Sequence, residues 1–182
     1  EGLFEEINAE DFEGDIDADM IVPRPNNCVA PQIFWSYVPF YDEAQAQANW
    51  GDARPTTIAD FFDVEKFPGK RGIHTWANAL IEMALVADGV AIADVYDVMD
   101  TEEGIDRAFA KLDTIKDHVV FWSSGAKPLE LVSSGEVSMS LAYNGRVGAA
   151  ILSEGAAFVP IWDGQVLEEE WLAIIKGSKN KD

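Results

Sequence analysis

Basic residues, cysteine and long apolar runs are scarce in this sequence. Its 182 residues contain 13 lysines and arginines against 33 acids, which gives a formal net charge of −20. Binding to phosphates requires a basic patch, so this balance argues against nucleic acid as a partner and disfavours anionic membranes. It is compatible with cationic solutes, and also with a surface that only favours solubility. No apolar run reaches the length that spans a bilayer, and no signal peptide opens the chain, as expected of a mature secreted form or a trimmed polypeptide.

The patterns typical of catalysis, metals and cofactors are missing as well. The single cysteine, Cys28, excludes an internal disulfide and has no recognisable histidine partner. The sequence has no Gly-x-Ser-x-Gly motif and no glycine loop for phosphates, and His74 and His118 make no metal-binding spacing with Cys28. We therefore expect no catalytic residue, no metal site and no cofactor.

The first 19 residues hold nine of the acids and neither lysine nor arginine. Asp15, Asp17 and Asp19 resemble the start of a calcium loop. The pattern then fails, because the sixth position is Met20 rather than Gly and the twelfth is Asn26 rather than Glu. We expect a solvated acidic leader rather than a metal site.

An apolar content of 48% is ample for one globular core, and its pattern indicates an α/β domain. Period-two alternation over 136–143 predicts a strand, which Asn144-Gly145 stops. A small-residue helix over 147–152 should end at Gly155, and 158–162 should form the next strand. Strand, helix and strand at this spacing predict a right-handed crossover with parallel pairing.

The other elements follow from apolar periodicity and capping residues. Thr56 or Thr57 can cap a short helix, Gly89 should end a buried one, and Asp100 with Glu103 has the spacing of a capping box. Further strands are expected at 32–38, 71–75 and 119–122, and the first of these should be covered on both faces. Further helices are expected at 58–62, 76–87, 100–115 and 129–133. The segment 42–54 should be a loop or a frayed helix.

Three strand ends carry residues suited to a ligand. In open parallel sheets, ligands gather outside the carboxyl ends of strands, where loops and helix N-termini present unpaired N–H groups. The candidates are Trp122-Ser123-Ser124, Tyr143-Asn144 and Trp162-Asp163.

Several segments, in the same order, resemble a known family over most of the chain, from about Cys28 to Asp182. They are "FPGKRG", "LIEMALVADGV", "SSGEVSMSLAYNGRVGAA", "VPIWDGQ" and "EEWLAIIKGSKNKD". They are similar to the extracytoplasmic solute-binding proteins of bacterial ABC importers, specifically the spermidine/putrescine-binding group. The resemblance implies a lobe of a type II periplasmic binding protein: an α/β three-layer sandwich whose mixed, mostly parallel sheet carries helices on both faces. Residues 28–182 would form the second lobe with its hinge strands, and residues 1–27 an acidic leader or stub of the first lobe.

The resemblance also implies a function. The chain would be part of a noncatalytic substrate-binding component that captures a small solute, a polyamine such as spermidine or putrescine, for import. Its partners would be the membrane permease and the missing first lobe of the same protein. Its location would be the periplasm, or, in a Gram-positive bacterium, the extracytoplasmic side of the cell membrane, to which it would be attached. Three alternatives stay open: an enzyme domain on the same layered fold, a binding protein for an amino acid or another small solute, and an acidic interaction module.

One site residue near "YNG" can be carried over from the resembled polyamine binders, and two of its neighbours are further candidates. Tyr143 would wall the cleft, where its ring attracts an ammonium and covers methylenes, or it packs on the neighbouring helix. Asn144 would bond the ligand or cap the following helix. Arg146 is unsuited to a cation and would suit a carboxylate, or it is an ordinary surface residue.

The returning hinge strand supplies two more candidates. In spermidine-type relatives this strand carries an aromatic residue and, two positions later, a carboxylate. Glu170 takes the carboxylate's place here, but the aromatic's place holds Glu168, and Trp171 is one step out of register. Alternation puts Glu168 and Glu170 on one face and Trp171 on the other, so either the acids or the tryptophan would face the ligand. Glu170 is the favoured candidate, and the alternative is that the three consecutive acids form an ordinary solvated loop.

The start of the helix at 76–87 departs from the polyamine pattern. Polyamine-selective relatives place two carboxylates there, whereas this sequence has Trp76 and Ala79. Their loss removes charge-assisted hydrogen bonds of about 1.5 to 3 kcal/mol each, so tight polyamine binding is in doubt. Trp76 would compensate through cation–π contact, mark a different ligand, or lie buried in the core.

Overall fold

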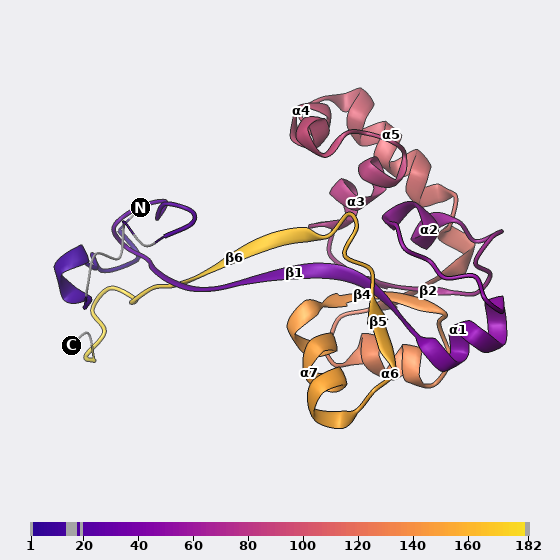
Figure 1. Ribbon diagram of the computed structural model, residues 1–182. Coiled ribbons are helices and arrows are strands. Elements are labelled where there is room, and N and C mark those ends of the chain that lie inside the picture. Colours follow the sequence, from indigo (N-terminus) through magenta and orange to yellow (C-terminus); the bar gives the residue numbers. More distant parts are fainter. Residues whose placement is uncertain (1, 14–17, 19, 181–182) are drawn as a thin grey trace. The chain divides into compact units, whose positions relative to one another are not determined.

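Two long strands carry the chain between two structural units. The computed structural model describes residues 2–13, 18 and 20–180 (Figure 1). One unit consists of Glu1–Trp35 with Glu168–Asp182, and the other of Ser36–Leu167. The chain passes from one to the other along β1 (Ala30–Asp42) and returns along β6 (Val166–Leu172), and these two strands pair with each other. The aspartates of the incomplete calcium pattern, Asp15, Asp17 and Asp19, lie outside the described residues.

Six strands in the described part of the chain form one mixed sheet with the order β3-β2-β4-β1-β5, and β6 pairs with β1 off this path. The remaining strands are β2 (Arg71–His74), β3 (Val119–Trp122), β4 (Met139–Tyr143) and β5 (Phe158–Pro160). β2 runs parallel to β3 and β4, whereas β1 is antiparallel to β4 and β5. The predicted mixed sheet is confirmed.

The expected direct pairing of the strands on either side of α7 is wrong. β4 and β5 run in the same direction, but β1 lies between them: Tyr37 opposes Tyr143, and Phe40 opposes Pro160. Local spacing predicts the direction of the two strands. It carries no information about a strand from a distant part of the chain that enters between them.

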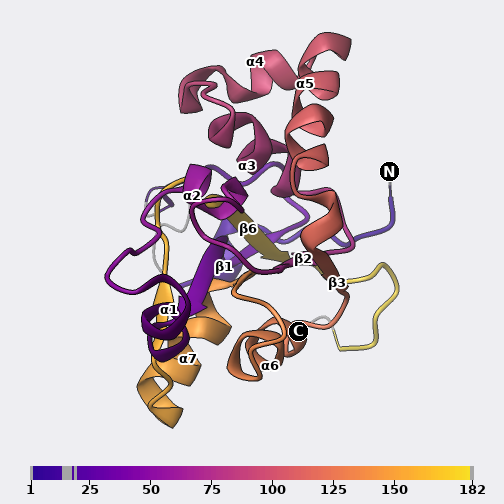
Figure 2. The same ribbon diagram turned by 90° about the vertical axis from the view of Figure 1, so that its right-hand side faces the viewer.

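Helices lie on both sides of the sheet of the larger unit, as predicted. α3, α4 and α5 pack on one another on one side, and α6 and α7 contact the strands from the other (Figures 1 and 2). The helices are α1 (Glu43–Trp50), α2 (Ile58–Phe62), α3 (Leu80–Ala87), α4 (Val95–Met99), α5 (Glu102–Asp113), α6 (Lys127–Ser133) and α7 (Asn144–Glu154), with 3-10 turns η1 (Ala9–Asp11), η2 (Ile92–Asp94) and η3 (Lys116–His118). Within the described residues, none of them is long and apolar enough to cross a membrane.

The core of the larger unit contains the central strands. Four consecutive residues of β4, from Met139 to Ala142, are buried, so both faces of this strand are covered. β1 changes along its length, because Pro31–Phe34 is exposed and Ser36–Tyr41 is buried. The prediction that 32–38 is covered on both faces is therefore confirmed only from Ser36 onward.

Helix ends match the sequence where a side chain can cap locally. Thr57 caps α2, and Gly155 ends α7 in the left-handed region, with φ 70°. The cap of α5 is Thr101 rather than the predicted Asp100: the Thr101 hydroxyl accepts a hydrogen bond from Gly104 N at 3.0 Å. The helix expected from residue 76 begins only at Leu80, because Ala79 takes φ 64° and breaks the helical path.

A buried arginine fixes the loop that leads into β2. Arg71 is fully buried, and its guanidinium donates hydrogen bonds to four backbone carbonyls, those of Phe61 (2.6 Å), Phe67 (2.6 Å), Gly69 (2.8 Å) and Asp63 (3.3 Å). Burial lowers the pKa of Arg71 to about 10, and the charge of Asp63 opposes this shift. The guanidinium therefore stays protonated at neutral pH and keeps all of its donors.

Asp60 holds the N-terminus of α2 in a similar way. Its carboxylate accepts from Thr56 N (3.0 Å), from Thr57 N (3.1 Å) and Oγ1 (3.0 Å), and from Lys66 Nζ (2.9 Å). Burial alone would raise the pKa of Asp60, but these hydrogen bonds lower it below its usual value.

Replacing Arg71 by methionine should lower the free energy of unfolding by at least about 2 kcal/mol, because several buried carbonyls lose their donor. Urea unfolding followed by circular dichroism measures the change. The matched control is Arg107→Met, which removes an exposed arginine paired with Asp88 and should cost less than about 1 kcal/mol. Equal losses in the two variants would show that the buried guanidinium is not a special anchor.

Asp60→Asn should lower stability by about 1 to 2 kcal/mol at pH 7. The folded-state pKa of Asp60 is lowered, so its contribution is present above the ordinary aspartate pKa and is lost as pH falls through the folded value. The difference between variant and wild type should therefore shrink in acid, as measured by urea unfolding at a series of pH values. Asp113→Asn, at an exposed pair with Lys116, is the control. A difference that stays constant down to pH 3 would contradict the role of the charge.

Candidate functional site

Three parallel strands end at one edge of the sheet in the larger unit. β2 lies between β3 and β4 and is parallel to both, and His74 at its end is in register with Trp122. Tyr143 ends β4 on the other side of β2. Two of the three predicted strand ends, Trp122-Ser123-Ser124 and Tyr143-Asn144, therefore meet.

The third predicted strand end has a structural role. Asp163 follows β5, and its Oδ2 accepts a hydrogen bond from Ile58 N at 2.9 Å, which supports the N-terminus of α2. Trp162 is about half exposed. On the path of the sheet, β1 lies between β5 and the three parallel strands.

Five rings form an aromatic cluster at the common edge: Tyr37, His74, Trp76, Trp122 and Tyr143. His74 is central, with ring centroids 4.4 Å from Trp76, 4.5 Å from Trp122 and 6.4 Å from Tyr37. Tyr143 lies 5.0 Å from Tyr37 and 6.0 Å from Trp122, and the two tyrosine hydroxyls are 3.3 Å apart.

Burial divides the aromatic cluster into a back and a front. Tyr37, His74 and Trp122 are buried, whereas Tyr143 is half-buried and Trp76 is 62% exposed. The alternative that Trp76 is a buried core residue is wrong. Exposed aromatic surface with a rigid backing suits the methylene groups of a small solute, or an ammonium group at a ring face.

Arg146 and the loop after β3 lie next to Tyr143. A Cβ on Gly125 would lie 2.7 Å from Arg146 Nε and 3.0 Å from the Tyr143 ring, so glycine permits this close approach. Arg146 is exposed and belongs to the first turn of α7. The structure thus places a cationic side chain beside an aromatic wall at a helix N-terminus, an arrangement that favours an anionic group.

Asn144 ties the start of α7 to β1. Its Oδ1 accepts a hydrogen bond from Ser36 N at 3.0 Å, and α7 has no side-chain cap, so the capping alternative for Asn144 is wrong. Ser36 Oγ and Trp122 Nε1 are buried and have no hydrogen-bond partner among the described residues.

Ser123 and Ser124 line a hollow of about 360 Å³ beside the cluster. Its other lining residues are Thr75, Phe121, Trp122, Lys127 and Glu130. Lys127 Nζ and Glu130 Oε2 are 3.2 Å apart, so the one carboxylate of this hollow already has a cationic partner. The hollow therefore offers no free pair of acids for a polyamine.

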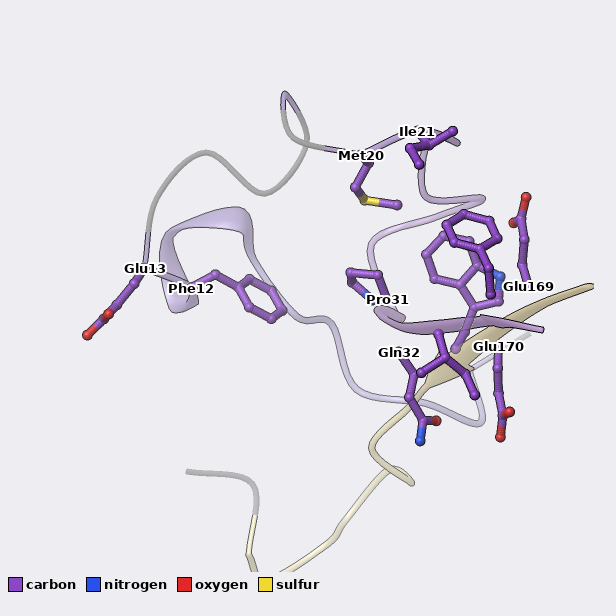
Figure 3. Close-up of a pocket in the computed structure, with 11 residues that line it drawn as sticks. Phe12, Glu13, Met20, Ile21, Pro31, Gln32, Glu169 and Glu170 are labelled. Atoms are coloured by element: carbon purple, nitrogen blue, oxygen red, sulfur yellow. The ribbon is translucent and has the colours of Figure 1, made fainter. Parts of the chain in front are cut away.

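Glu170 and Trp171 belong to the smaller unit and not to the unit that holds the aromatic cluster. They line a mainly apolar hollow of about 410 Å³, together with Phe12, Glu13, Met20, Ile21, Pro31, Gln32, Ile33, Phe34 and Glu169 (Figure 3). Glu169 and Glu170 leave β6 in opposite directions, in agreement with the alternation expected from the sequence (Figure 3).

Sequence reasoning missed two members of the cluster, His74 and Tyr37. His74 lies at the carboxyl end of the strand predicted at 71–75, two residues before Trp76, and this position could have identified it. Tyr37 reaches the cluster by long-range pairing of β1 with β4, for which the sequence gives no local signal. Among the described residues, no three His, Cys, Asp or Glu side chains form a group that could hold a metal ion.

Comparison with known proteins shows the same fold and a common family. The profile of the family described as "Bacterial extracellular solute-binding protein" matches residues 5–182. The gamma-aminobutyric acid-binding protein of Pseudomonas aeruginosa is 41% identical over 184 residues, which cover 100% of this chain and 49% of that protein. The PBP MotA of A. tumefaciens B6, solved in complex with glucopine, is 32% identical with a TM-score of 0.83, and the match covers 98% of this chain and 53% of that one. The Atu4243-GABA receptor is 31% identical with a TM-score of 0.79, and the match covers 99% of this chain and 52% of that one.

Likeness to a polyamine binder is limited to the fold. The spermidine/putrescine-binding protein PotD of Streptococcus pneumoniae is 13% identical, with a TM-score of 0.70. The expected membership of the polyamine group is therefore not supported. The relatives are solute-binding proteins and not enzymes, which counts against the enzyme-domain alternative.

The chain spans about half the length of the relatives it matches. The family profile matches nearly all residues of this chain, and the solved structures that resemble it have the same fold. This chain belongs to the bacterial extracellular solute-binding protein family.

Proposed function

We propose that this chain is part of the solute-binding component of a bacterial ABC importer and that the aromatic cluster contributes one wall of the solute site. The observation that carries the proposal is the meeting of three strand ends, where Trp76 and Tyr143 present ring surface on a buried backing. β1 and β6 would act as hinge strands of the second lobe, residues 28–182, with residues 1–27 as a stub of the first. The protein would work in the periplasm or at the extracytoplasmic membrane surface and deliver its solute to a permease.

The solute we propose is a small zwitterion with a carboxylate at one end and an amine at the other, such as γ-aminobutyrate. A relative that is 41% identical carries that ligand in its name. Arg146 forms no ion pair within the described residues, so its guanidinium is available to a carboxylate, and the N-terminus of α7 adds favourable N–H dipoles. Tyr143 would cover the methylenes, and the ring of Trp76 would favour the ammonium group.

A polyamine fits this wall less well. It would place an ammonium group near Arg146, and the hollow at Ser123 and Ser124 offers only Glu130, which is paired with Lys127. The net charge of −20 raises the local concentration of any cation, but it is a property of the whole chain and not of the cluster. Overall charge and site chemistry thus favour different solutes, and the site chemistry decides which one binds.

Calorimetry on a two-lobed protein that carries this sequence tests the solute class. We expect γ-aminobutyrate to bind and putrescine and spermidine to bind at least about 100-fold more weakly, because the diamines lack the carboxylate that Arg146 would hold. Tight binding of the polyamines together with no response to γ-aminobutyrate would overturn the zwitterion assignment and spare the transport role.

Arg146→Met in the same protein should weaken γ-aminobutyrate binding by about 10- to 100-fold, since a charge-assisted hydrogen bond is lost. Arg107→Met, on α5 and paired with Asp88, is the matched control and should leave affinity unchanged. If both variants bind as tightly as the wild type, Arg146 does not contact the solute.

A further inference from the structure

The turn between β2 and α3 depends on one histidine. Trp76 N donates a hydrogen bond to His74 Nδ1 at 2.9 Å, and Thr75 N donates to Trp122 O at 3.0 Å. The turn ends at Ala79, whose φ of 64° is the one positive value at a non-glycine residue in the described part of the chain. A left-handed alanine costs of order 1 kcal/mol, so the contacts within the turn must hold it in place.

The hydrogen bond defines the protonation state of His74. Nδ1 can accept from Trp76 N only when it carries no proton, so the imidazole is neutral with its proton on Nε2. His74 is 5% exposed, and burial lowers its pKa below the ordinary value of 6.5. The neutral form therefore predominates at pH 7.

No carboxylate among the described residues forms an ion pair with His74. The elements around it carry, among other titratable and charged residues, Tyr37 of β1, Tyr143 of β4, Glu82 of α3, Asp113 of α5, Lys116 of η3, and Lys127 and Glu130 of α6. Asp113 pairs with Lys116 at 3.4 Å, and Lys127 with Glu130 at 3.2 Å. On its own strand, Arg71 is engaged with backbone carbonyls. The carboxylates of Asp113 and Glu130 are therefore already engaged by lysines.

We infer that His74 is a positioning residue for the solute site: its neutral Nδ1 holds the turn that presents Trp76, and protonation of the ring releases this turn. Protonation puts a second N–H on the ring, and two donors then face each other where one hydrogen bond had been. Cation–π contact with neighbouring rings cannot restore that bond. The consequence for the solute rests on the proposed function, because it requires Trp76 to contact what the protein binds.

The turn itself can be tested without any ligand, by NMR titration of the 182-residue chain between pH 7.5 and 4.5. In the wild type, the backbone amide of Trp76 should shift in one step that coincides with the titration of the His74 ring. In the variant His74→Asn, the side-chain Oδ1 can accept the hydrogen bond from Trp76 N, and the amide does not titrate. His74→Asn should therefore abolish the step and keep the Trp76 amide near its wild-type position at pH 7. His74→Phe keeps a ring but has no acceptor, and its Trp76 amide should resemble the acid form at every pH.

An unchanged Trp76 amide in the wild type across the His74 titration would overturn the inference, and so would the same step in His74→Asn. The wild-type titration needs no substitution, so the test does not depend on how well either variant folds.

Affinity supplies the functional readout in the two-lobed protein. Between pH 7.5 and 5.5 neither charged group of γ-aminobutyrate titrates. Wild-type affinity should fall about 3- to 10-fold across the pH range in which NMR shows the His74 ring to titrate, as expected for one lost hydrogen bond, while the affinity of His74→Asn stays flat. A wild-type affinity that does not change across that range would overturn the inference. A Trp76 step without γ-aminobutyrate binding at any pH would instead support the turn mechanism and contradict the proposed function.

Discussion

The parallel pairing of β2 with both β3 and β4 is the constraint on which the rest of the site depends. Because the three strands run in the same direction, their last residues, His74, Trp122 and Tyr143, reach one edge of the sheet. β2 has only four residues, and its entry is fixed by the buried guanidinium of Arg71 and its bonds to the preceding loop. Arg71, a charged residue at the start of β2, thus helps to fix the position of the aromatic cluster at the end of the same strand.

Much of the fold could be predicted from local sequence signals, and the errors share a cause. Thr57 as a cap, Gly155 as a helix end and the strand at 119–122 depend on neighbouring residues, and the structure confirms them. The pairing of β4 with β5 was predicted wrongly because β1 comes from a distant part of the chain. The late start of α3 depends on the left-handed Ala79, whose conformation is imposed by the surrounding turn.

The candidate site was predicted in part for the same reason. Trp122 and Tyr143 end strands that are recognisable from the sequence, so both could be placed at one edge of a parallel sheet. Asn144 carries a typical capping side chain, yet its oxygen bonds Ser36 on β1, a contact between residues far apart in the sequence. Tyr37 could not be assigned for the same reason. The solute class was the weakest prediction, because a net charge of −20 describes the whole surface and says nothing about the residues beside Tyr143.

A crystal structure of a two-lobed protein carrying this sequence, grown with γ-aminobutyrate, is the most direct test of the claim that the strand-end cluster forms the solute site. The account predicts electron density for the solute against Tyr143, with its carboxylate within hydrogen-bond distance of Arg146. Solute bound away from the ends of β2, β3 and β4, for example in the hollow lined by Phe12 and Trp171, would contradict it.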